Sequence, residues 1–158
     1  MTVYAVRRQT RSEAGVRIIP EEQLSSVLGR ADHIVNLLPD NAGTRNYVNA
    51  RRLSCLRPGT RFYNVGRGAT VDERALVEAL RSGRVGEAYL DVFQTEPLPS
   101  GHPFWELPNC HVTPHTAGGR HDQNEALVRH FLANLEAFTR GTPLTDRTNL
   151  NFLPGLAA

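Results

Sequence analysis

The feature that most constrains the fold is the alternation of short apolar runs with segments whose apolar residues recur at helical spacing. The apolar runs are bounded by Gly, Pro, Asn and Asp, which favours strands over buried helices. Strand-then-helix alternation along a chain is typical of a parallel α/β architecture. At 158 residues the chain is long enough for one domain with a core of its own. We therefore expect a doubly wound parallel sheet.

The pattern predicts about six short strands and four helices. The strands are expected at 3–6, 15–19, 33–38, 61–65, 86–93 and 110–113, and the helices at 20–28, 49–56, 72–82 and 120–140. The apolar run at 33–38 is expected to be buried on both faces, as central parallel strands are. Asp72 is an N-cap residue type and is expected to begin the third helix.

Composition excludes several functional classes. The formal charge is +2 and the basic residues, all arginine, are spread along the chain, which argues against nucleic acid as a partner. No apolar run approaches the ~20 residues of a membrane span, and no signal segment opens the chain. Cys55 and Cys110 lack the spacing of a zinc site or a disulfide framework, so buried reduced thiols and no bound metal are expected. These features predict a soluble cytoplasmic protein that binds neither nucleic acid nor membrane.

Ligands of doubly wound sheets bind outside the carboxyl ends of the strands, so chemistry is sought in the turns that follow them. His115 follows the last strand, and an imidazole suits proton transfer near neutral pH. Glu96 follows the preceding strand in a proline-stiffened turn, and a carboxylate beside an imidazole favours its protonated form and fixes its orientation. Arg67 lies between Gly66 and Gly68, which let the backbone approach a ligand closely, and a guanidinium can hold a carboxylate through paired hydrogen bonds. Each of these residues taken singly also fits an ordinary surface turn.

Taken in order, the segments 64–76, 90–99 and 113–115 resemble the signature set of the D-isomer-specific 2-hydroxyacid dehydrogenases, and within them the glyoxylate/hydroxypyruvate reductases. The likeness runs from about 3 to 141. It implies a Rossmann-type domain and hydride transfer from NAD(P)H to a small 2-keto acid. It further implies that Arg67 binds the substrate carboxylate or carbonyl, that His115 is the general acid/base, and that Glu96 sustains His115. A homodimer is the assembly that the resemblance implies.

The same resemblance assigns residues to the cofactor. Asp91 matches the position on the nicotinamide side, and turn residues match those that line the cofactor, namely Leu38, Pro39, Val65, Gly66, Ala117 and Gly118. Arg7, Arg8 and Arg11 follow the first strand of this chain, where arginine accommodates the 2′-phosphate of NADP and an acid selects NAD. NADP is therefore favoured over NAD.

No G-x-G-x-x-G phosphate-binding turn occurs in the sequence. By the resemblance, that turn and the first strand would precede Met1, so residues 1–141 are expected to form a partial NAD(P)-binding domain and 142–158 a tail toward a substrate domain. The central strand of such a sheet is strand 1. Its absence predicts unpaired edges at 3–6 and 33–38, marginal stability and an inactive chain.

Two alternatives remain open. The chain could be a non-catalytic remnant that serves as a dimerisation or cofactor-binding module, against which the intact Arg67, Glu96 and His115 speak. It could also be another nucleotide-fold enzyme, such as a relative of the S-adenosylhomocysteine hydrolases, against which the order of the three motifs counts. An upstream glycine-rich turn would favour the enzyme, and its absence the remnant.

Overall fold

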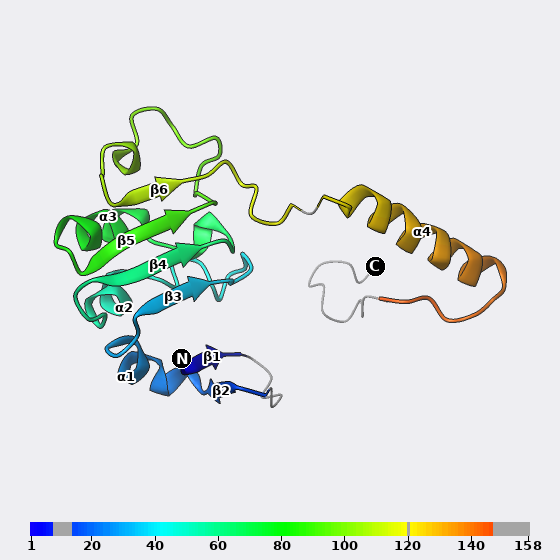
Figure 1. The fold of residues 1–158 in the computed structure, drawn as a ribbon, viewed down its shortest axis with the longest axis horizontal. Helices are drawn as coiled ribbons and strands as arrows, with labels where there is room; N and C mark the ends of the chain where they lie inside the picture. The colour runs from blue at the N-terminus through cyan, green and yellow to red at the C-terminus, as the bar shows by residue number, and fades with distance from the viewer. Residues whose placement is uncertain (8–13, 120, 147–158) are drawn as a thin grey trace. The chain divides into compact units, whose positions relative to one another are not determined.

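The computed structural model describes residues 1–7, 14–119 and 121–146. The chain divides into two compact units, Met1–Gly118 and Gly119–Ala158. The first unit contains the six strands β1 Val3–Val6, β2 Val16–Ile19, β3 His33–Asn36, β4 Thr60–Asn64, β5 Val85–Leu90 and β6 Cys110–Val112 (Figure 1). Its helices are α1 Leu24–Leu28, α2 Ala50–Ser54 and α3 Glu73–Arg81, with short 3-10 turns η1 Glu21–Gln23, η2 Gly68–Thr70 and η3 Pro103–Trp105. The element order is the one that the sequence pattern predicts.

The strands form two parallel sheets, so the fold is of the Rossmann-like α/β class. β3, β4, β5 and β6 are neighbours in chain order, and β1 pairs with β2 in a separate sheet. Within the described residues, β1 has no strand partner besides β2, and β3 none besides β4. The unpaired edges expected at 3–6 and 33–38 are therefore confirmed.

One face of the four-stranded sheet carries the core. The side chains that alternate inward along β4 and β5, such as Phe62 and Ala88, pack with the apolar sides of α2 and α3. Helix α3 buries Leu76 and Leu80, and Asp72 caps it as expected, its Oδ1 accepting the N–H of Ala75 at 3.1 Å. The core thus fixes the strands from one side and leaves their carboxyl ends free to support turns.

The other face of this sheet is exposed, which corrects the expectation for 33–38. The strand ends at Asn36, and Val35 on the outer face is 56% exposed. No helix of the first unit covers this face among the described residues, so alternate side chains of β3 meet solvent. Across the four strands the rings of His33, Tyr63, Tyr89 and His111 stack one on the next.

The second unit contains α4, Gln123–Thr139, which lies inside the helix expected at 120–140. None of its side chains is buried, and its apolar residues are exposed, namely Leu127, Val128, Phe131, Leu132, Leu135 and Phe138. After the helix the chain returns to it through Thr145, whose backbone N–H donates to Asn134 Oδ1 at 2.9 Å. Arg8, Arg11, Arg120 and the tail from 147 lie outside the described residues.

Neither a membrane-crossing helix nor a metal-binding cluster is found in the described part of the chain. No helix there is both long and apolar enough to cross a membrane. No group of three or more His, Cys, Asp or Glu side chains there could hold a metal ion. Cys55 and Cys110 are both free and half-buried, and burial raises the pKa of the Cys110 thiol to about 11.

Candidate active site

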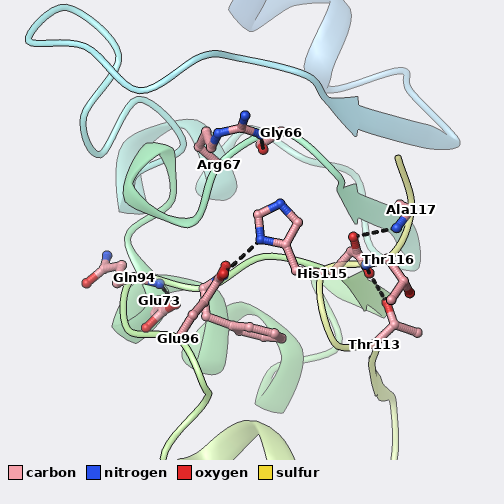
Figure 2. Close-up of polar contacts among 11 residues, drawn as sticks. Gly66, Arg67, Glu73, Gln94, Glu96, Thr113, His115, Thr116 and Ala117 are labelled. Carbon is pink, nitrogen blue, oxygen red and sulfur yellow. Dashed lines mark hydrogen bonds and ion pairs between the residues drawn. The ribbon is translucent and has the colours of Figure 1, made fainter. Parts of the chain in front are cut away.

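Three turns at the carboxyl ends of β4, β5 and β6 bring together the residues predicted to carry chemistry. Figure 2 shows the ring of His115 turned toward Glu96, with Arg67 across from it. Arg67 follows β4, Glu96 follows β5 and His115 follows β6, all within the first unit. Because parallel strands end on one edge of the sheet, residues that are far apart in sequence meet there.

Glu96 and His115 form a direct pair. His115 Nδ1 lies 2.8 Å from Glu96 Oε2, and the second oxygen of Glu96 accepts the backbone N–H of Phe93 at 2.9 Å. The hydrogen bond from His115, followed by that from Phe93, lowers the pKa of the Glu96 carboxyl. An ionised Glu96 orients the imidazole with its proton on Nδ1, which leaves Nε2 for another partner. The side chain of His115 is half-exposed, so such a partner can reach it.

The backbone of His115 is held in an unusual conformation. Its φ is +54°, in the left-handed region that residues other than glycine rarely adopt. Its N–H donates to the carbonyl of Thr113 at 3.1 Å, closing a tight turn at the end of β6. Such strained backbone persists where surrounding contacts over-determine it, and it gathers at functional sites.

Those contacts come from Asp91, which is 4% exposed beneath the turn. Its carboxylate accepts the hydroxyl of Thr113 and the backbone N–H groups of Thr116 and Ala117, the last two at 2.9 and 2.8 Å. Burial alone raises the pKa of Asp91, but the hydrogen bonds from Thr113, Ala117 and Thr116 outweigh it, so the pKa lies below its usual value. Asp91 therefore fixes the segments on both sides of His115.

The turn that carries Arg67 packs closely on its neighbours. A Cβ on Gly66 would lie 2.9 Å from the carbonyl oxygen of Leu38, and one on Gly68 would lie 1.9 Å from the carbonyl carbon of Phe93. In this structure the two glycines are thus needed for approach to the protein's own backbone, a reason different from the ligand approach expected from sequence. The exposed Arg67 donates from Nη1 to the carbonyl of Gly66 at 2.7 Å.

A buried polar network beneath these turns was not predicted. Asn36 Nδ2 donates to Asn64 Oδ1 at 2.9 Å and to Thr70 Oγ1 at 2.7 Å. The side-chain Oδ1 of Asn36 accepts the backbone N–H of Leu38, and the side-chain Oδ1 of Asn64 accepts the backbone N–H of Gly66. The signal available in the sequence was an asparagine at the end of each of two predicted strands, where an amide can bond the following turn.

The residues that the sequence assigns to cofactor binding suit one part of a dinucleotide. Val65 and Pro39 present exposed apolar surface at the ends of β4 and β3, beside the half-buried Leu38, and Ala117 and Gly118 are exposed after the turn that Asp91 holds. Arg7 lies directly after β1. These surfaces suit the flat ring end of a dinucleotide, while the sequence holds no glycine-rich turn for its pyrophosphate.

A family model, D-isomer specific 2-hydroxyacid dehydrogenase, NAD binding domain, matches residues 1–117. The match contains β1 to β6 and the turns of Arg67, Glu96 and His115. The chain belongs to this family. The resemblance of the three sequence motifs is thereby confirmed.

Relatives of the family agree with this membership. Glyoxylate/hydroxypyruvate reductase A of Serratia proteamaculans is 38% identical over 120 residues, which are 76% of this chain and 38% of that protein. A D-isomer specific 2-hydroxyacid dehydrogenase from Xanthobacter autotrophicus, solved with NADPH and MES, is 37% identical with a TM-score of 0.83 over 95% of this chain and 62% of its own. The NADPH-dependent glyoxylate/hydroxypyruvate reductase of Sinorhizobium meliloti, solved with NADP and sulfate, is 35% identical with a TM-score of 0.83 over 94% of this chain and 48% of its own. The chain spans less than half the length of the curated relative.

Proposed function

We propose that this chain supplies the proton-transfer and substrate-anchoring residues of an NAD(P)H-dependent reductase of small 2-keto acids. The observation that carries the proposal is the Glu96–His115 pair, at 2.8 Å, at the same sheet edge as Arg67. A proton donor, a carboxylate that orients it and a guanidinium are the groups that reduction of a carboxylate-bearing carbonyl requires.

In this mechanism a bound nicotinamide supplies the hydride to the carbonyl carbon. Arg67 exchanges its hydrogen bond to the carbonyl of Gly66 for paired bonds to the acid group of the substrate. His115 donates the proton on Nε2 to the oxygen that becomes the hydroxyl. Glu96 keeps the other ring nitrogen protonated throughout, so the ring stays aligned as its charge changes.

We further propose that the turn residues Leu38, Pro39, Val65 and Gly66 contact the cofactor, together with Ala117 and Gly118. Asp91 acts on the cofactor through the turn that it holds, because its own oxygens accept three bonds from that turn. NADP is the favoured cofactor, supported by arginines 7 and 8 after β1 and by the NADP(H) bound in the two solved relatives.

The substrate and assembly proposed for the active protein follow from its relatives. Glyoxylate and hydroxypyruvate are the proposed substrates, because the similar Serratia and Sinorhizobium proteins carry those names. A homodimer is the proposed assembly. Residues 1–141 are proposed as the cofactor-binding part and 142–158 as a segment toward a substrate domain.

The deciding experiment is a fluorescence titration of the 158-residue chain with NADPH, combined with a thermal melt and an assay of NADPH oxidation with hydroxypyruvate. We expect weak or no turnover from this chain by itself, since the edges of β1 and β3 are unpaired. Turnover that His115→Gln abolishes while binding persists would support the assignment of His115. Turnover that is unchanged in His115→Gln would contradict it.

A second candidate function is a module that binds cofactor or a second copy without chemistry. The division of the strands into two sheets favours it, because each sheet has an open edge. This candidate predicts saturable NADPH binding or a stable dimer in light scattering, and any turnover that His115→Gln abolishes would exclude it.

A further inference from the structure

A second carboxylate–imidazole pair lies behind the first. Glu73, the first residue of α3, has its Oε2 at 3.4 Å from Nε2 of His102, the residue that caps η3. Both side chains are largely buried, with exposed fractions of 15% for Glu73 and 20% for His102. The other oxygen of Glu73 accepts the backbone N–H of Gln94 at 2.8 Å. One carboxylate thus joins a helix start, a 3-10 turn and the loop after β5.

That loop is the one from which Glu96 reaches His115. Two consecutive backbone N–H groups in it are each held by a carboxylate, since Phe93 donates to Glu96 and Gln94 donates to Glu73. The side chain of Gln94 adds a third tie, from Nε2 to the carbonyl of Val71 at 2.6 Å. Figure 2 shows Glu73 beside Gln94, on the same side of the site as Glu96. The placement of Glu96 therefore depends on where Glu73 holds the loop.

His102 is fixed from the opposite side. Its Nδ1 accepts the backbone N–H of Phe104 at 3.3 Å, so its ring proton lies on Nε2, toward Glu73. Its ring also packs on the ring of Phe104, with centroids 4.5 Å apart, and Phe104 is 1% exposed. A ring held by the core in one tautomer is a rigid donor for the Glu73 carboxylate.

We propose that Glu73 is a positioning residue for the Glu96–His115 pair and that His102 supports it. The effect of Glu73 on catalysis rests on the proposed function above, whereas its effect on the geometry of His115 does not. Glu73 acts through the Gln94 backbone and is assigned no contact with substrate or cofactor.

The chemistry of the contact makes Glu73→Gln a sharp test. A carboxylate offers both oxygens as acceptors, one for Gln94 and one for His102. A glutamine of the same shape has one oxygen, and its NH₂ group would face either a backbone N–H or the Nε2–H of His102. Glu73→Gln therefore loses one of the two contacts that position 73 makes, to Gln94 or to His102, without loss of side-chain volume.

The readout is the tautomer of His115 in the 158-residue chain, from imidazole ¹⁵N shifts recorded well above the usual titration range of histidine. The wild-type chain is expected to show His115 with its proton on Nδ1, as the bond to Glu96 requires. In Glu73→Gln we expect a loss of that tautomer and faster hydrogen exchange of the Gln94 amide, by about tenfold or more, as loss of a charge-assisted hydrogen bond implies. Glu78→Gln is the control, because Glu78 lies on the same helix and its side chain pairs with Arg81 at the exposed surface.

Further variants decide between the outcomes. In a Glu96→Gln background, adding Glu73→Gln should leave the His115 shifts unchanged, because the effect runs through Glu96. If Glu73→Gln does not fold by thermal melt, Glu73→Asp keeps both acceptors on a shorter side chain and should move the His115 shifts in the same direction. An unchanged His115 tautomer in a folded Glu73 variant overturns the proposal. A wild-type chain that shows the expected tautomer, with turnover that His115→Gln leaves unchanged, contradicts the proposed function and leaves the positioning role standing.

Discussion

Gly68 lies directly against the backbone of Phe93, so closely that a Cβ at position 68 would sit 1.9 Å from the Phe93 carbonyl carbon. Gly68 follows Arg67, and Phe93 lies in the loop that carries Glu96. This one contact therefore sets the spacing between the substrate anchor and the partner of the proton donor.

Gly68→Ala is expected to destabilise the first unit by about 3 kcal/mol or more, since the clash is with backbone and neither strand end can move freely. Gly101→Ala is the control, because nothing lies within 4 Å of a Cβ built there. Thermal and urea unfolding measure the difference. Equal stability of the two variants would mean that the two turns are not packed as described.

Asp91 is expected to make the stability of the chain sensitive to acid. Its folded-state pKa is lowered, so its contribution is complete above the pKa of the unfolded chain and is lost as pH falls through the folded-state pKa. Asp91→Asn should lower the free energy of unfolding by about 1–3 kcal/mol at neutral pH, because it sets an amide donor against backbone donors. The difference in free energy of unfolding between wild type and variant should become smaller below about pH 5.

The matched control for Asp91→Asn is Asp32→Asn, because the Asp32 carboxylate pairs with Arg57 at the exposed surface. Its effect should stay within about 0.5 kcal/mol. Urea unfolding at a series of pH values gives both comparisons, and a pH-independent gap for Asp91→Asn would argue against the lowered pKa.

Arg67→Lys is expected to behave as a loss-of-function change in any form of the protein that turns over. Lysine offers a point charge where paired hydrogen bonds to a carboxylate are proposed. We expect kcat/KM for hydroxypyruvate to fall by about 10²-fold, most of it in KM, on the scale of two charge-assisted hydrogen bonds. Arg74→Lys, at an exposed position on α3, is the control. A wild-type KM in Arg67→Lys would remove Arg67 from the substrate site.

Cys110 is expected to react slowly with thiol reagents. A pKa of about 11 leaves little thiolate at pH 8, about two orders of magnitude less than an unperturbed cysteine has. Labelling of a Cys55→Ser variant, which isolates Cys110, should accelerate with pH up to the raised pKa. A rate at pH 8 equal to that of free cysteine would show that the thiol is not buried as described.

The sequence predicted the order of the elements and the placement of Arg67, Glu96 and His115 in turns that follow strands, because these depend on local patterns. The cap at Asp72 is a local pattern of this kind, and so is the placement of His115 after a strand. The exposure of Val35 could not be predicted, since a β-branched residue suits a strand equally whether a helix covers it or not. Burial is decided by elements distant in sequence.

The supports of the site escaped prediction for the same reason. The bonds of Asn36 to Asn64 and Thr70, and of Glu73 to Gln94, each join positions that are 21 or more residues apart. Each residue read singly is an ordinary polar residue near a turn. Their roles appear only when the parallel register brings the strand ends together.

The row of stacked rings on the exposed sheet face has a spectroscopic consequence. The rings of Tyr63 and Tyr89 lie 5.1 Å apart and are inclined by only 8°, on adjacent strands. Two phenol rings held at that separation have a fixed, chiral environment, so the near-ultraviolet circular dichroism of this chain should carry a tyrosine signal that is lost when β4 and β5 separate. The protein therefore contains an optical signal, which needs no label, for the pairing of its central strands on the exposed face of the sheet.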